Sequence, residues 1–204
     1  QRYRLIDAPI TRYLIGAGLK ISGQDKPVSD WDWTLNWHEN KKNGSLPQMD
    51  QLAAARISVA FLFPFSVLLL YLIGRELGGK WTGWLGCFLF GVNALVLIHT
   101  RRAMAESALL FSELLMMFFL MKTPSNPWLL AVGAALAFNS KQSTFPLFLV
   151  GLFSLFFFNY KGRNWLKRLW NSITYGILFI LITFFLNPVF WSHPIFAIQD
   201  SIHF

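Results

Sequence analysis

The sequence predicts an all-α, polytopic membrane protein, because its composition is apolar and its charges fall between long uncharged stretches. Of its 204 residues, 54% are hydrophobic and only 14% are charged, and the mean hydropathy is +0.44. Soluble domains carry about a quarter charged residues. Five stretches contain no Asp, Glu, Lys or Arg: 57–74, 81–100, 123–140, 142–160 and 169–199. Helices that cross a bilayer need about 20 mostly apolar residues, and these stretches are of that length.

A transmembrane helix bundle is expected over residues 53–187. Its hydrophobic segments are predicted near 56–74, 81–99, 103–121, 127–143, 144–159 and 171–187. The third carries two carboxylates, Glu106 and Glu113. The fourth ends in the polar stretch 139–144, so we expect a broken or tilted helix there. Non-helical backbone at membrane depth survives only where protein or a wet cavity surrounds it.

Residues 1–52 are expected to form a polar first loop with an interfacial helix. The stretch 9–22 predicts a short amphipathic helix, which suits the membrane interface. Three tryptophans between residues 31 and 37 suit the same environment. Asn43-Gly44 predicts a turn. The final stretch, 188–204, is expected to be a truncated segment on the side of the first loop, with both chain ends being cuts in a longer protein.

The distribution of basic residues predicts how the bundle is oriented. Alternate connections carry them: Arg75 with Lys80, then Lys122, then Lys161, Arg163, Lys167 and Arg168. Cytoplasmic loops are enriched in Lys and Arg, so these connections should be cytoplasmic. The formal net charge of +8 is therefore spread over short clusters, which argues against a nucleic-acid partner.

Five charged residues fall at the predicted outer boundary, where the charge rule does not explain them: Asp7, Arg101, Arg102, Glu106 and Lys141. Ionisable residues at membrane depth are costly and usually face the protein interior or a cavity. Together they predict an outward-facing pocket with carboxylate and cationic groups. The cations suit an anionic ligand.

Structural interpretations of these residues stay open. Arg102 and Glu106 are four apart and could pair along a helix. Lys141 could extend to the interface, and Asp7 could cap a helix that begins at Pro9. The sequence contains no phosphate-loop pattern, no dinucleotide fingerprint and no cysteine pair for zinc.

Five segments resemble motifs of one family, in the order in which the family carries them: residues 7–15, 55–75, 99–109, 135–141 and 187–194. The first, Asp7-Ala8-Pro9-Ile10, is similar to the Asp-His-Pro-Pro signature of the protein O-mannosyltransferases and their relatives. The third and fourth resemble the family's Ser-Arg and Thr-Lys segments. The family comprises GT-C membrane glycosyltransferases, which include bacterial aminoarabinose transferases.

The resemblance implies a fold, a reaction and partners. The fold would be a GT-C-like transmembrane bundle. The reaction would be inverting transfer of a sugar from a polyprenyl-phosphate donor to a protein or lipid hydroxyl on the outer or lumenal face. The enzyme would be multi-pass, in the plasma membrane of a prokaryote or the endoplasmic reticulum of a eukaryote. Membrane lipids would be further partners.

The resemblance also suggests roles for the five charged residues. Arg101, Lys141 and Arg102 would hold the donor phosphate. Asp7 and Glu106 would orient sugar or acceptor, or assist the catalytic base. Some relatives of the aminoarabinose branch bind a divalent ion, and Asp7, His99 and Glu106 could contribute to such a site.

Departures from the family pattern leave two alternatives open. Ala8 stands where His is usual, Ile10 replaces the second Pro, and Glu106 replaces Asp. The family's first acidic motif lies upstream of Asp7, so the general base is expected outside these residues. A catalytically inactive scaffold subunit fits these departures. A transporter with a broken helix at 139–144 is the other alternative.

Overall fold

The computed structural model describes residues 9–24, 29, 31–157 and 165–192, and this part of the chain contains helices and turns but no strand. The helices are α2 (Pro9–Ile21), α3 (Trp37–Lys42), α4 (Met49–Ala60), α5 (Leu62–Val92), α6 (Ala94–Thr100), α7 (Glu106–Lys122), α8 (Pro127–Ser140), η1 (Gln142–Thr144), α9 (Phe145–Phe157), α10 (Trp165–Leu186) and α11 (Val189–Ser192). The all-α prediction is confirmed for the described residues.

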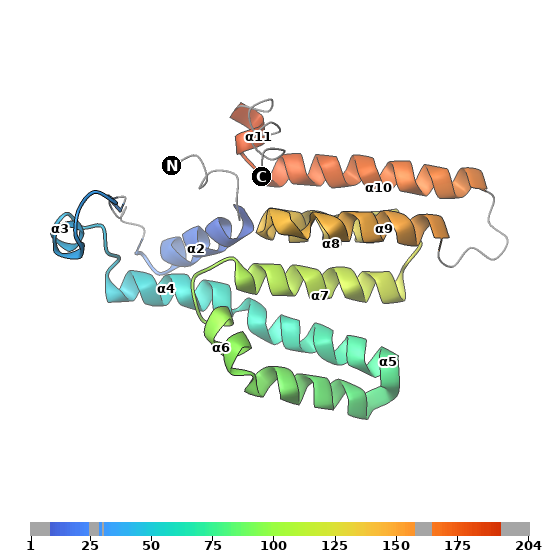
Figure 1. The fold of residues 1–204 in the computed structure, drawn as a ribbon, viewed down its shortest axis with the longest axis horizontal. Coiled ribbons are helices and arrows are strands. Elements are labelled where there is room, and N and C mark those ends of the chain that lie inside the picture. The colour runs from blue at the N-terminus through green and yellow to red at the C-terminus, as the bar shows by residue number, and fades with distance from the viewer. Residues whose placement is uncertain (1–8, 25–28, 30, 158–164, 193–204) are drawn as a thin grey trace.

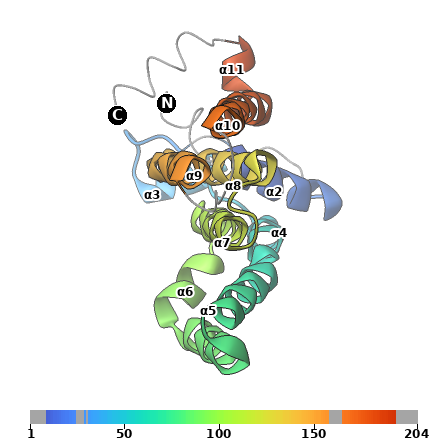
Figure 2. The same ribbon diagram turned by 90° about the vertical axis from the view of Figure 1, so that its right-hand side faces the viewer.

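Helix α8 is the centre of the bundle. Figure 1 shows α7, α8 and α10 as neighbouring, nearly parallel rods with α8 in the middle, and Figure 2 shows α9 beside α8. The buried positions of α8 are mostly small, and Ala131, Ala135 and Ala137 have no exposed surface. Small residues let helix backbones approach closely inside a membrane. The central core joins α8 to Met116 of α7 and Tyr175 of α10.

The bundle has two distinct ends. The α2 end contains the first turn of α2, the start of α7 and the last turn of α8; the Lys122 end contains the end of α7 and the start of α10 (Figure 1). Tyr13 of α2 donates a hydrogen bond from its hydroxyl to the Leu186 carbonyl at 2.7 Å, which fixes α2 to the end of α10. At the other end, Glu76 and Lys122 form an ion pair. The connection with Arg75 and the connection with Lys122 therefore lie at the same end, as the charge pattern predicts. That this end faces the cytoplasm stays a prediction.

Helix α5 is bent back on itself. Gly78 and Gly79 have non-helical backbone angles, and Gly79 has a φ of 86°, which favours glycine. Figure 1 shows the halves of α5 before and after this bend lying side by side. The predicted segments 56–74 and 81–99 are thus separated where the sequence places Arg75 and Lys80. Gly74 and Gly83 meet where the halves touch, because a Cβ on Gly74 would lie 2.8 Å from the Gly83 Cα.

We expect Gly83→Ala to destabilise the protein, because the added Cβ would lie 2.8 Å from the backbone oxygen of Tyr71. Overpacking of this kind typically costs about 1–3 kcal/mol. Gly91→Ala is the matched control on the same helix, since nothing lies within 4 Å of its Cβ position. Thermal unfolding of the detergent-solubilised protein measures the difference. Equal midpoints for the two variants would contradict this packing.

The predicted helix of the first loop is confirmed, as is the turn that follows. Helix α2 ends at Ile21 and packs on α4, where Gly18 lies against Ser58. The turn at Asn43-Gly44 has a φ of 76° at Gly44. The position of α2 in a membrane interface stays a prediction, as does the division of the chain at residues 52 and 187.

The described helices include apolar stretches suited to a membrane. Met49–Val92 and Trp165–Leu186 are long and apolar enough to cross one, and Pro127–Ser140 and Gln142–Phe157 are shorter apolar helices. Only 22% and 17% of the two longer apolar windows are buried within the chain. Their exposed apolar surfaces are therefore consistent with lipid contact. That the chain crosses the membrane about six times stays a prediction.

Candidate functional site

The start of α7 and the end of α8 bring two of the predicted site residues to the same end of the bundle. Glu106 is the first residue of α7, and Lys141 directly follows α8. The hydroxyls of Ser112 and Ser140 lie 3.3 Å apart and align the two antiparallel helices. Glu106 precedes Ser112 by six residues, so it lies about 9 Å farther along the axis toward the α2 end. The two charged residues thus share this end without being in direct contact.

Lys141 occupies the predicted break between two helices. Its backbone is extended, with φ −160° and ψ 126°, before the short helix η1 begins. The break is well supported: the Lys141 N–H donates to the Ala137 carbonyl at 3.0 Å, and the Thr144 hydroxyl donates to the Lys141 carbonyl at 2.8 Å. The Lys141 side chain is half-buried, and no carboxylate among the described residues pairs with its ammonium group. A fixed backbone and an available cation suit an anionic ligand.

Glu106 and the two arginines lie around the connection from α6 to α7. Arg101 and Arg102 are exposed on the turn between these helices, whereas Glu106 is half-buried. The alternative in which Arg102 and Glu106 pair along a helix does not hold, because α7 begins only at Glu106 and Arg102 lies on the non-helical turn before it. The backbone N–H of Arg102 donates to the His99 carbonyl at 3.4 Å, as part of this turn. The arginine side chains are therefore available to a ligand rather than held in this pair.

Five buried polar atoms on the helix ends at the α2 end have no hydrogen-bond partner in the part of the chain that the structure describes. They are the Thr11 Oγ1, His99 Nδ1, Glu106 Oε2, Asn139 Oδ1 and Thr183 Oγ1 atoms. Leaving a buried polar group unpaired costs about 1–3 kcal/mol. Each of these atoms therefore calls for a partner, such as a ligand, water or further protein, that the described residues do not supply.

Sequence reasoning did not single out Thr11 and Asn139 as site residues. Thr11 is 4% exposed and lies in the first turn of α2, and Asn139 is 1% exposed in the last turn of α8. The Asn139 amide donates to the Ala135 carbonyl at 2.8 Å, so only its oxygen is left unpaired. For Asn139 the available signal was a polar residue two positions before Lys141 at the end of an apolar run, but its burial is visible only after folding.

Asp7 lies outside the described residues, so both its predicted site role and its capping role stay untested. The sequence places it two residues before Pro9, the first residue of α2. The divalent-metal hypothesis includes Asp7 and also stays untested. Within the described ranges, no three His, Cys, Asp or Glu side chains gather as a metal site would require.

The chain thus combines helices that are apolar and long enough to cross a membrane with cations at one end of the bundle that suit an anionic ligand. The family model described as dolichyl-phosphate-mannose-protein mannosyltransferase matches residues 1–204, and the chain belongs to this family. Comparisons with curated proteins and with solved structures give no match. The resemblance inferred from the five sequence motifs is thereby confirmed. The family is membrane-integral and consists of glycosyltransferases that use a polyprenyl-phosphate-mannose donor and a protein acceptor.

Proposed function

We propose that this protein transfers mannose from a polyprenyl-phosphate donor to a hydroxyl group of a protein on the outer or lumenal face of the membrane. The observation that carries the proposal is the family match over residues 1–204, in a chain that brings Lys141, Arg101 and Glu106 to one end of its bundle. The described residues would equally allow the acceptor hydroxyl to belong to a lipid.

The basic residues at the Lys122 end support this orientation. Lys122 ends α7, and Arg75 and Lys80 lie at the bend of α5 (Figure 1). Cytoplasmic connections carry an excess of such residues. The α2 end, with its unpaired polar atoms, would then face the opposite side, where a lipid-linked sugar and a translocated acceptor meet.

Transfer requires one bond to form as another breaks. The acceptor oxygen attacks the anomeric carbon from the face opposite the lipid phosphate, and the phosphate leaves with the bonding electron pair. The acceptor proton passes to a carboxylate acting as general base. Negative charge grows on the phosphate oxygens, where preorganised cations give their largest benefit in a site shielded from water.

The described residues fit distinct parts of this reaction. Lys141, Arg101 and Arg102 would stabilise the leaving phosphate. Glu106 would orient a sugar hydroxyl or one of the arginines, because its buried Oε2 has an unused acceptor position among the described residues. Asp7 would orient the acceptor or assist the base.

We expect Arg101→Ala to lower mannose transfer about 100-fold, because removing one preorganised charge from a transition state has effects of this order. Arg75→Ala is the matched control: both arginines are exposed, but Arg75 lies in the bend at the Lys122 end. Transfer is measured in membranes that contain the full-length protein and a radiolabelled polyprenyl-phosphate mannose. Equal activity of Arg101→Ala and wild type would remove Arg101 from the phosphate role.

A catalytically inactive scaffold is the second candidate, favoured by Ala8 and Ile10 in place of the family's His and Pro. A scaffold would show no transfer with any lipid-linked sugar, and substituting Arg101 would not change its binding of the lipid phosphate. Reduced donor binding together with lost transfer in Arg101→Ala would favour the enzyme.

A further inference from the structure

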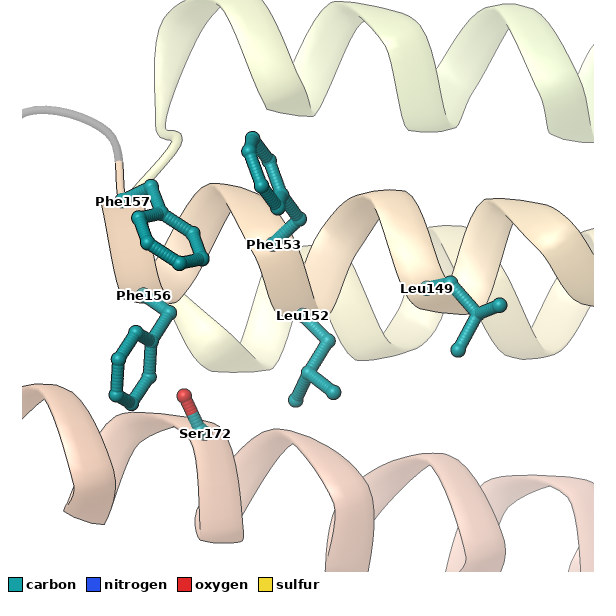
Figure 3. Close-up of a pocket in the computed structure, with 6 residues that line it drawn as sticks. All are labelled: Leu149, Leu152, Phe153, Phe156, Phe157 and Ser172. Atoms are coloured by element: carbon teal, nitrogen blue, oxygen red, sulfur yellow. The ribbon is translucent and has the colours of Figure 1, made fainter.

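A groove between α9 and α10 lies toward the Lys122 end, away from the candidate site. Its volume is about 380 Å³, and it is lined by Leu149, Leu152, Phe153, Phe156, Phe157 and Ser172. Figure 3 shows the five apolar side chains along the last turns of α9, with Ser172 on the neighbouring turn of α10. The wall is thus hydrocarbon except at one point.

That point is the Ser172 hydroxyl. Ser172 is only 9% exposed, and its Oγ has no hydrogen-bond partner among the described residues. In Figure 3 this oxygen points from α10 toward α9, between Phe156 and Leu152. A buried hydroxyl without a partner is costly, and a plain hydrocarbon chain in the groove would not relieve that cost. The groove therefore suits a ligand that is apolar but carries one hydrogen-bond acceptor at this depth.

Basic residues lie one to two turns from Ser172, toward the start of α10. Arg168 precedes Ser172 by four residues and is therefore on the same face of the helix. Lys167 is exposed and lies about 7 Å farther along the axis than Ser172. Basic residues at a membrane surface attract anionic lipid headgroups. The cations thus lie nearest the start of α10, Ser172 comes next beside Phe156, and Leu152 and Leu149 lie farther along the groove (Figure 3).

We propose that this groove binds an anionic glycerophospholipid. One acyl chain lies against the apolar residues of α9, an ester carbonyl accepts a hydrogen bond from Ser172, and the phosphate faces Lys167 and Arg168. A glycerophospholipid presents phosphate, ester and acyl chain in this order. A polyprenyl chain has no ester, and the phosphate of the proposed donor would be bound at the opposite end of the bundle. The proposal is therefore independent of the transfer reaction.

The ester contact is tested with two lipids that differ only in their linkage. Purified full-length protein is given equal amounts of a diester phosphatidylglycerol and its diether analogue, and the retained lipid is quantified by native mass spectrometry. We expect wild type to retain the diester roughly fivefold more, as the loss of one hydrogen bond implies. Ser172→Ala should remove this preference.

Thr183→Val is the matched control, because Thr183 is also a buried hydroxyl on α10 without a partner among the described residues but does not line the groove. It should keep the diester preference. Lys167→Gln should reduce the preference for phosphatidylglycerol over phosphatidylcholine while leaving the diester preference intact. Circular dichroism and thermal unfolding confirm that each variant is folded.

Two results would overturn the proposal. One is equal retention of diester and diether lipid by the wild-type protein. The other is displacement of phosphatidylglycerol by equimolar polyprenyl phosphate in wild type and Ser172→Ala alike, which would assign the groove to the isoprenoid chain.

Discussion

Replacing Lys141 with glutamine should lower mannose transfer by about 100-fold or more, the largest effect we expect for any residue of the candidate site. The side chain lies at the break between α8 and η1, where hydrogen bonds at both backbone groups hold its position. A cation held in place before the reaction begins stabilises a developing phosphate charge without a reorganisation cost. Loss of this charge should appear in kcat as well as in donor affinity.

Two further variants separate this role from a structural one. Lys141→Arg should retain part of the activity, because it keeps the positive charge at the same backbone position. Lys80→Gln removes an exposed lysine from the bend of α5 at the other end and should leave transfer unchanged. If Lys141→Gln is folded and transfers mannose at the wild-type rate, Lys141 does not act on the phosphate and its interpretation as an interfacial lysine gains support.

Replacing Glu106 with glutamine should lower transfer by about 10- to 100-fold, within the range attributed to single preorganised or proton-handling groups. The amide preserves the shape of the side chain but removes its charge. Glu106 starts α7, and its buried Oε2 is without a partner among the described residues, so a sugar hydroxyl or a cation is expected there in the loaded enzyme.

Glu113→Gln is the matched control for this prediction, since Glu113 lies on the same helix two turns farther from the α2 end and is also half-buried. Its transfer rate should stay within a few-fold of wild type. Comparable losses in the two variants would mean that the carboxylates support α7 as a whole. A normal rate in Glu106→Gln would remove Glu106 from the site.

The sequence was sufficient to predict most helices and the break between α8 and η1. Uncharged runs mark the apolar helices because a bilayer excludes charge, and the polar stretch before Phe145 marks the end of α8. Lys141 was predicted as a site residue because it is a single cation between two long uncharged stretches. The charges at Arg75 and Lys80 predicted the connection between two apolar segments that the bend of α5 provides.

Features that depend on packing could not be predicted in the same way. Spacing alone allowed a helical pair of Arg102 and Glu106, but the position where α7 begins decides whether that spacing has helical geometry. The unpaired oxygens of Thr11 and Asn139 are another example, because their burial arises from helices distant in sequence. Ser172 is a third, since a serine within an apolar helix gives no sign that it lines a groove.

We propose a lipid-phosphate sugar as the direct donor, and one measurement tests this most directly. Membranes with the full-length protein are supplied with either radiolabelled polyprenyl-phosphate mannose or nucleotide-linked mannose, while synthesis of the lipid-linked form is blocked. We predict mannose transfer to protein, with matching release of polyprenyl phosphate, from the lipid-linked donor alone. Transfer from the nucleotide sugar under the block, or no transfer from the lipid-linked donor by a folded protein, would contradict the account.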